Sequence, residues 1–204
     1  MEIREYIRQV LNEGINGKTI VCVDIQPEYA SYFGFDAKEW AKFLNRSNRT
    51  NSLLLLYNGD QLGMISEHEY RDWLHSIGVK EDIAYSVRMV DKGYAFFRYC
   101  MDSGIDEDAI VDLVRFMRSN SINDSRDIDK EMWNAFSQQY PHDGIRELLE
   151  HADDLISIPD LMDDLSRIHN IVLTGGGVNE CLKEVEIALK ALNKPYTTLE
   201  EFTY

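Results

Sequence analysis

The sequence lacks any apolar run close to the roughly 20 residues that a membrane-spanning helix needs. Its hydrophobic stretches are short and are interrupted by charged or polar residues. The N-terminal segment MEIREYIRQVLNEG is predicted to form a short amphipathic helix with charges of both signs. It does not have the uninterrupted apolar core of a signal peptide. We therefore expect a cytoplasmic protein with no membrane partner.

Cysteine and histidine are also scarce, and neither is arranged for metal binding. The three cysteines, Cys22, Cys100 and Cys181, form no C-x-x-C pair, and the five histidines are dispersed along the chain. An odd, small number of cysteines without a secretory signal favours free thiols over disulfides. Structural zinc sites need closely spaced ligands. We therefore expect no metal and no cofactor.

Positive charge is in short supply. The chain has 21 basic and 36 acidic residues, which gives a formal net charge of −15. Such a surface repels the phosphate backbone of nucleic acids and anionic membranes, so no nucleic-acid partner is expected. The 204 residues contain no internal repeat, and this length suits one α/β domain spanning residues 1–204.

Short apolar runs alternate with segments of helical periodicity along the chain. This alternation predicts a three-layer αβα fold with a mostly parallel, Rossmann-like sheet of about six strands. Residues about 99–152 are mostly helical in pattern and predict an insertion. The expected strands are Lys18–Asp24, Ser52–Tyr57, Ile83–Val90, Leu155–Ile158, Ile171–Thr174 and Tyr196–Leu199. The expected helices are Asp36–Leu44, a helix capped by Ser66 that ends near Gly78, Asp106–Met117, Asp129–Gln139, Asp143–His151 and Cys181–Leu192.

Ligands of such sheets bind beyond the carboxyl ends of the strands. Polar residues and a glycine turn follow the predicted strands at this edge. They are Asp24, Asn58, Asp60, Asp91, Lys92 and the turn Gly175–Cys181.

The turn before Cys181 has two interpretations. Its three glycines leave backbone amides uncovered, and Asn179 is expected to cap the helix, with Cys181 in the first turn. The helix dipole would then lower the pKa of the thiol and make it a nucleophile. Equally, Cys181 is a buried cysteine packed where the helix meets the sheet. The amides expected to receive an oxyanion are those of Gly176, Gly177, Val178 and Glu180.

Asp24 and Lys92 each have a structural alternative when taken singly. A carboxylate after a strand commonly caps a turn, and a lysine stem packs on neighbouring aromatic residues. Together with Cys181, however, they place a thiol, a carboxylate and an ammonium at three strand ends. In one cleft the carboxylate would accept the thiol proton, and the lysine would stabilise both anions.

Three segments resemble motifs of the isochorismatase-like cysteine hydrolases, which include nicotinamidases. They are VDIQPEY at Val23–Tyr29, KGYAFF at Lys92–Phe97 and GGGVNECL at Gly175–Leu182. The resemblance implies Asp24 as the general base, Lys92 as the charge stabiliser and Cys181 as the nucleophile.

The same resemblance carries further expectations about the site. It implies a parallel six-stranded sheet, a small-molecule substrate and a homo-oligomer. The Asp-x-His metal ligands of nicotinamidases have no counterpart, so a metal is not implied. The neighbouring residues that we expect to contact substrate are Gln26, Tyr29, Asn58, Asp60 and Tyr94.

The preferred hypothesis is a metal-independent cysteine hydrolase that acts on a small amide or a related C–N or C–O bond. Val178 stands where the family usually has threonine, and the insertion lengthens the separation between the lysine and cysteine motifs. These two features motivate a second hypothesis, a non-catalytic protein that binds a small ligand or serves in assembly. In a third, Asp24, Asp60 and Asp91 hold Mg²⁺ for phosphoryl transfer.

Overall fold

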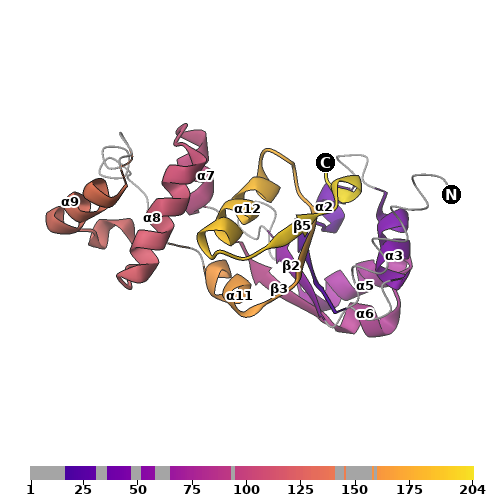
Figure 1. Cartoon of the computed structure of the whole chain (residues 1–204). Coiled ribbons are helices and arrows are strands. Elements are labelled where there is room, and N and C mark those ends of the chain that lie inside the picture. Colours follow the sequence, from indigo (N-terminus) through magenta and orange to yellow (C-terminus); the bar gives the residue numbers. More distant parts are fainter. Residues whose placement is uncertain are drawn as a thin grey trace.

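The computed structural model describes residues 17–30, 36–46, 52–57, 65–92, 95–140, 145, 158 and 160–204. Within these residues, five parallel strands form one sheet in the order β3-β2-β1-β4-β5 (Figure 1). The strands are β1 (Thr19–Val23), β2 (Ser52–Tyr57), β3 (Val87–Asp91), β4 (Ile171–Gly175) and β5 (Tyr196–Thr198). β1 is the central strand and pairs with β4. The segments that directly follow β1 and β4 therefore lie next to each other.

Helices cover both faces of the sheet, as expected for parallel strands that are buried on both sides. Ile20 and Cys22 of β1 pack in a core with α3, α5 and α6, whereas Val21 and Val23 pack in a second core with α11 and α12. The arrangement is consistent with the predicted three-layer α/β fold. The helices on these two faces are α3 (Ala37–Arg46), α5 (Glu67–Ile77), α6 (Glu81–Tyr85), α11 (Leu161–Arg167) and α12 (Cys181–Ala191).

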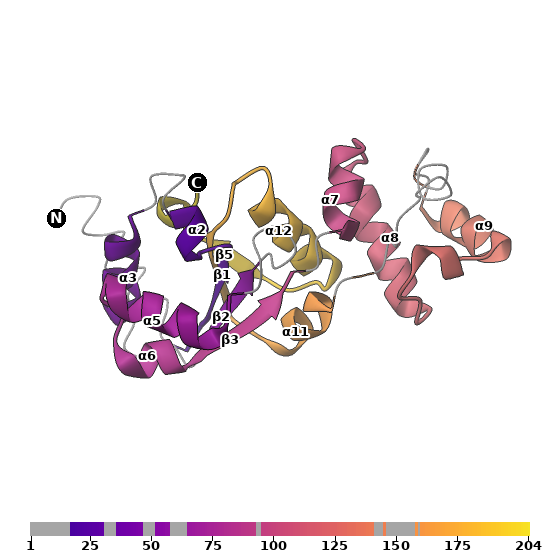
Figure 2. The same cartoon turned by 180° about the vertical axis from the view of Figure 1, so that it is seen from behind.

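Three further helices form an arm at one end of the sheet (Figure 2). They are α7 (Ala95–Asp102), α8 (Glu107–Ser119) and α9 (Lys130–Gln139). Short elements complete the described chain: α2 (Pro27–Ala30), η1 (Ser125–Asp127) and η2 (Glu200–Phe202). The arm falls largely within the segment for which the sequence predicts a helical insertion, although α7 begins before residue 99.

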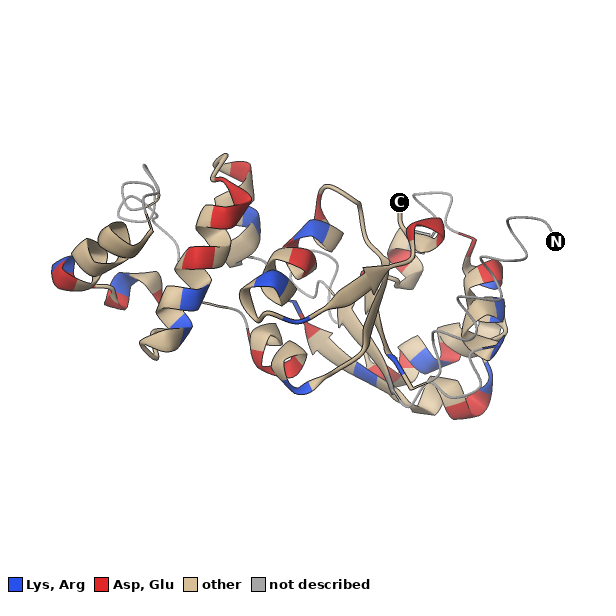
Figure 3. Ribbon diagram, viewed as in Figure 1, with Lys and Arg blue, Asp and Glu red and all other residues tan. Residues whose placement is uncertain are grey.

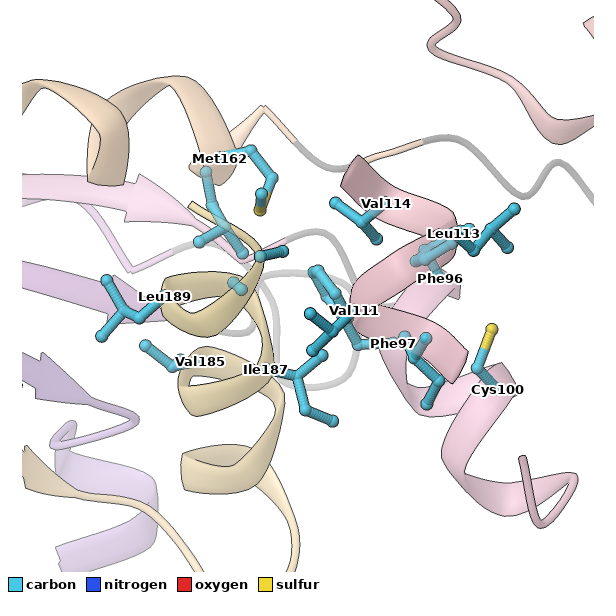
Figure 4. Packing of buried hydrophobic residues seen from close by; sticks show 14 of the residues in the cluster. Phe96, Phe97, Cys100, Val111, Leu113, Val114, Met162, Val185, Ile187 and Leu189 are labelled. Atoms are coloured by element: carbon cyan, nitrogen blue, oxygen red, sulfur yellow. The ribbon is translucent and has the colours of Figure 1, made fainter. Parts of the chain in front are cut away.

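The arm is packed against α12. Figure 4 shows Val111 of α8 and Ile187 of α12 between the two helices, and both are buried in the same core. Both signs of charge occur on α8 and α12 (Figure 3). Glu107 of α8 forms ion pairs with Lys183 and Lys190 of α12. Apolar burial and these ion pairs therefore fix the arm to the helix that begins with Cys181.

Local sequence signals explain several boundaries. The Ser66 side chain accepts a hydrogen bond from the Glu69 amide at 3.2 Å, and the Glu69 carboxylate accepts one from the Ser66 amide at 2.9 Å. This capping box begins α5, and Gly78, at a φ of +98°, ends it. The predicted strand Ser52–Tyr57 is confirmed at both ends.

The predicted strand Ile83–Val90 is wrong in its first half. Residues Glu81–Tyr85 form α6, and β3 begins at Val87. Two acidic residues, Glu81 and Asp82, lie in the first turn of α6, where the helix dipole favours negative charge. Ile83 and Ala84 of α6 are buried. A short apolar run does not by itself distinguish a strand from such a helix.

Other element predictions have mixed outcomes. The described residues contain five strands rather than about six. Of the expected strand Leu155–Ile158, residues 155–157 lie outside the described residues, and Ile158 is not in a strand. Most of the expected helix 143–151 also lies outside them, although Ile145 is helical. No helix among the described residues is long and apolar enough to cross a bilayer.

Candidate functional site

Asp24 lies immediately after β1, at the centre of the sheet edge. Its amide donates to the Leu56 carbonyl of β2 at 2.8 Å, and its own carbonyl accepts from the Gln26 amide at 3.0 Å. The backbone of Asp24 is left-handed, with a φ of +51°, which Asp tolerates better than most residues. This conformation turns the chain out of the sheet directly after the strand. The Asp24 side chain is fully buried.

Lys92 extends β3 by one more hydrogen bond, because its amide donates to the Tyr57 carbonyl at 2.9 Å. Its Nζ lies 2.7 Å from Oδ2 of Asp24, although β2 separates the two strands. Burial lowers the pKa of Lys92, but the negative charges of Asp24 and Glu184 outweigh burial, and the net shift is upward. Lys92 is therefore a buried ammonium held between carboxylates.

The glycine turn after β4 comes very close to the end of β1. A Cβ on Gly175 would lie 2.3 Å from Cγ1 of Ile25 and 2.4 Å from the Val23 carbonyl oxygen. Gly176 has a φ of +69°, and a Cβ there would lie 2.9 Å from the Leu182 amide nitrogen. Only glycine fits such positions. The turn thereby brings the start of α12 and Cys181 to the same sheet edge as Asp24.

The turn differs from the prediction in how the helix starts. Glu180, not Asn179, is the N-cap residue, and it makes no side-chain capping hydrogen bond. The amide of Val178 donates to the Tyr204 carbonyl at 3.0 Å, and the Glu180 amide donates to the Gly177 carbonyl at 3.0 Å. Two of the four amides expected to bind an oxyanion are therefore already engaged. The roles of the Gly176 and Gly177 amides stay predictions.

The pKa of Cys181 shifts in the direction opposite to the one expected from the nucleophile interpretation of the turn. Burial first, and then the negative charges of Asp24 and Glu184, together raise the pKa of the thiol to about 12, against the opposing effect of Lys92. Asp24 also acts on the thiol as a hydrogen-bond acceptor. Oδ1 of Asp24 is buried and has no hydrogen-bond partner among the described residues. Cys181 is therefore a neutral thiol at rest, close to an available carboxylate oxygen.

Sequence reasoning missed two charged residues of the site, Glu184 and Arg98. Oε2 of Glu184 lies 3.2 Å from Nζ of Lys92, and Oε1 accepts from Nε of Arg98 at 2.7 Å. Nη2 of Arg98 lies 3.6 Å from Sγ of Cys181. Glu184 follows Cys181 by three residues on α12, a spacing that places two side chains on one helix face. Arg98 comes from α7, and no local pattern indicated its position.

Two tyrosines also lie near the charged cluster. The Tyr204 hydroxyl donates to the Asp24 carbonyl at 3.2 Å, and the Tyr204 amide donates to the Gly176 carbonyl at 3.1 Å. Burial, followed by the charges of Asp24 and Cys181, raises the pKa of Tyr29 and of Tyr204. Tyr204 is a third residue that the sequence did not indicate, since it is 180 residues from Asp24.

The expected substrate contacts are only partly described. Tyr29 is half-buried near Asp24, and Gln26 is fully buried, with Nε2 donating to Oε2 of Glu28 at 3.4 Å. Oε1 of Gln26 has no hydrogen-bond partner among the described residues. The other three expected contacts, Asn58, Asp60 and Tyr94, lie outside the described residues.

The arrangement of acids does not fit the magnesium hypothesis. Asp24 is paired with the Lys92 ammonium at 2.7 Å, where a cation ligated by Asp24 would have to lie. Asp91 is exposed, and Asp60 lies outside the described residues. In the part of the chain that the structure describes, no group of three His, Cys, Asp or Glu residues is placed to hold a metal ion.

Comparisons of the chain with models of protein families, with curated proteins and with solved structures found no match.

Proposed function

We propose that the chain is a metal-independent cysteine hydrolase that cleaves a small amide or a related C–N or C–O bond. One observation carries the proposal: the buried ion pair of Lys92 and Asp24, at 2.7 Å, lies beside the thiol of Cys181. Burying a charge is costly, so buried ion pairs outside functional sites are uncommon. The resemblance of the three motifs to isochorismatase-like hydrolases gives the same assignment of roles.

The first step uses Asp24 as the general base. Sγ of Cys181 attacks the substrate carbonyl carbon, and the thiol proton passes to Asp24 as the S–C bond forms. The raised pKa of Cys181 makes this base necessary, because almost no thiolate exists at neutral pH. The Lys92 ammonium stabilises the negative charge that develops on the attacked group.

The second half of the reaction returns the enzyme to its starting state. The C–N or C–O bond breaks as the leaving group takes the proton from Asp24, and an acyl thioester remains on Cys181. Water then attacks the thioester with Asp24 as its base, the acid product leaves, and the proton restores the thiol. No metal ion or cofactor takes part in these steps.

Two further expectations belong to this proposal. The three cysteines, all described and all unpaired, agree with a reducing compartment such as the cytoplasm. A homo-oligomer is expected from the family resemblance alone, and light scattering of the purified protein measures it directly.

A second candidate is a non-catalytic protein that binds a small ligand at the same site. The observation that favours it is the engagement of the Val178 and Glu180 amides, at 3.0 Å each, within the turn. An oxyanion needs free donors. This candidate predicts a ligand that binds but is never turned over.

A screen of small amides and esters distinguishes the two candidates. Under the hydrolase proposal, at least one compound is hydrolysed, and Cys181→Ala abolishes the activity. Cys100→Ala is the matched control, because Cys100 is a buried cysteine packed in the arm rather than beside Asp24. Absence of turnover across the screen, or equal turnover by Cys181→Ala, would contradict the hydrolase proposal.

A further inference from the structure

Arg98 reaches from α7 to the start of α12, where it contacts both Cys181 and Glu184. Its Nε donates to Oε1 of Glu184 at 2.7 Å, and its Nη2 lies 3.6 Å from Sγ of Cys181. The Arg98 side chain is 17% exposed, compared with 3% for Lys92. The guanidinium is therefore held through Nε, and the Arg98 side chain as a whole keeps more solvent exposure than that of Lys92.

The two cations of the site are not equally neutralised. Lys92 contacts two carboxylates, those of Asp24 and Glu184, at 2.7 and 3.2 Å. Within the described part of the chain, Arg98 is in ion-pair contact with one carboxylate, that of Glu184, and only through Nε. The two terminal nitrogens, of which Nη2 faces Sγ of Cys181, make no hydrogen bond to a carboxylate among the described residues. Parallel N–H groups on the edge formed by two such nitrogens match the two oxygens of a carboxylate.

We propose that Arg98 binds a carboxylate of the substrate and so selects small molecules that carry a carboxylate close to the scissile bond. The hydrolysis of such molecules rests on the proposed function, whereas their binding does not. Half-amides and half-esters of short dicarboxylic acids have this structure.

The distances limit the length of such a substrate. A carboxylate oxygen bound to Arg98 would lie about 2.8 Å from a terminal nitrogen. The attacked carbon must come within about 3.5 Å of the sulfur. Because Nη2 and Sγ are themselves only 3.6 Å apart, the carboxylate and the attacked carbon are separated by few bonds.

Because the chain has a large negative net charge, a preference of Cys181 for anionic reagents would have to come from a cation close to the thiol. At −15 the protein as a whole repels anions. A thiol without a neighbouring cation on this protein would therefore react more slowly with an anionic reagent than with a neutral reagent of the same size. The proposal predicts that a guanidinium 3.6 Å from the sulfur reverses that order.

Alkylation of Cys181 with iodoacetate and with iodoacetamide measures the preference without requiring turnover. In both reactions the sulfur forms a C–S bond as the C–I bond breaks, iodide leaves, and the thiol proton passes to the solvent. The reagents differ only in carrying a carboxylate or an amide. At one fixed pH the fraction of thiolate cancels in the ratio of the two rates, and peptide mass spectrometry assigns the product to Cys181.

Arg98→Gln is expected to lower the ratio of the iodoacetate rate to the iodoacetamide rate by about tenfold or more. Arg98→Gln combined with Glu184→Gln preserves the net charge of the site and is expected to lower the ratio as well. Arg98→Lys retains the positive charge but loses the parallel N–H groups that bind both oxygens of a carboxylate, so an intermediate ratio is expected. Arg126→Gln is the matched control, since Arg126 is exposed and pairs with Asp124 in the arm.

A second measurement serves if the thiol reacts with neither reagent. Succinamate and the neutral succinamide are titrated separately into Cys181→Ala by calorimetry. Succinamate is expected to bind more tightly, and the preference is expected to disappear in Cys181→Ala with Arg98→Gln. Equal binding of the two compounds to Cys181→Ala, or an alkylation ratio unchanged by Arg98→Gln, would overturn the assignment of Arg98.

The two proposals fail in different ways. Hydrolysis of neutral amides at Cys181, with an alkylation ratio that Arg98→Gln does not change, retains the hydrolase and removes the carboxylate site. A ratio that falls in Arg98→Gln, without hydrolysis of any amide or ester, retains the carboxylate site and removes the hydrolase.

Discussion

Nζ of Lys92 lies 2.7 Å from Oδ2 of Asp24, and this contact joins the end of β3 to the end of β1 across β2. Both side chains are almost completely buried, with exposed fractions of 3% and 0%. Charges in such a position are stable only as partners. The contact therefore holds both side chains in position, with the Lys92 ammonium facing the Asp24 carboxylate.

Removing the Lys92 charge is expected to destabilise the fold. Lys92→Met leaves the carboxylates of Asp24 and Glu184 buried without their shared partner, a loss of about 3–5 kcal/mol in the free energy of unfolding. Urea denaturation measures it. Lys42→Met is the matched control, because Lys42 pairs with Glu39 on the exposed face of α3 and the expected change is below about 1 kcal/mol. Equal stability of the two variants would contradict a buried ion pair.

The thiol of Cys181 is expected to lose its proton only at a pH well above the usual range for cysteine. Its pKa is raised to about 12 from an ordinary value of 9.0, by burial first and then by Asp24. The rate of alkylation by iodoacetamide should therefore keep rising above pH 9.0. In Asp24→Asn the negative charge is removed and Lys92 keeps only Glu184 as a carboxylate partner, so the thiolate is stabilised more and the rate should level off at a lower pH. A wild-type rate that levels off near pH 9.0 would show that the Cys181 thiol does not experience these carboxylates.

Gly175 and Gly177 are expected to differ sharply in their tolerance of alanine. A Cβ on Gly175, at a φ of +78°, would lie 2.3 Å from Cγ1 of Ile25. Gly175→Ala should therefore cost about 3 kcal/mol or more in the free energy of unfolding. A Cβ on Gly177 meets its nearest neighbour at 3.4 Å, so Gly177→Ala should cost less than about 1 kcal/mol. Thermal denaturation compares the two, and similar losses would argue against the close approach of the turn to β1.

Alkaline pH is expected to destabilise the protein partly through Cys100. Burial raises the pKa of Cys100 to about 12, above its ordinary value of 9.0. Between these values the unfolded chain has lost the proton that the folded chain retains, so stability falls as the pH rises. Wild type should lose stability faster than Cys100→Ala in this range, by about 1.4 kcal/mol per pH unit. Urea denaturation at several alkaline pH values tests this, and equal slopes would contradict the burial of the thiol.

The central strands were the part of the fold most accessible to sequence reasoning. A parallel strand covered on both faces is a continuous apolar run, and SLLLLY is such a run. The segment from Ile83 to Val90 was harder, because burial of Ile83 and Ala84 against one face of the sheet suits a helix as well as a strand. Its helical start depends on contacts with α5 that are set by the tertiary fold.

Only part of the candidate site could be predicted from the sequence. Asp24 and Lys92 were found because each directly follows a strand, and parallel topology brings strand ends together. Arg98 was missed because its contact with Cys181 spans 83 residues and leaves no local pattern. The direction of the Cys181 pKa was wrong for a related reason. The helix terminus and Asp24 were visible in the sequence, whereas the burial of the thiol and the second carboxylate, that of Glu184, were not.

The central claim is that Cys181 attacks the substrate with Asp24 as its base. Peptide mass spectrometry during the turnover of a slowly hydrolysed ester or amide tests it most directly. We predict an acyl group on Cys181 that forms and decays at the rate of turnover, forms at least about a hundredfold more slowly in Asp24→Asn, and is absent in Cys181→Ala. Turnover without acylation of Cys181, or acylation at an equal rate in Asp24→Asn, would contradict the account.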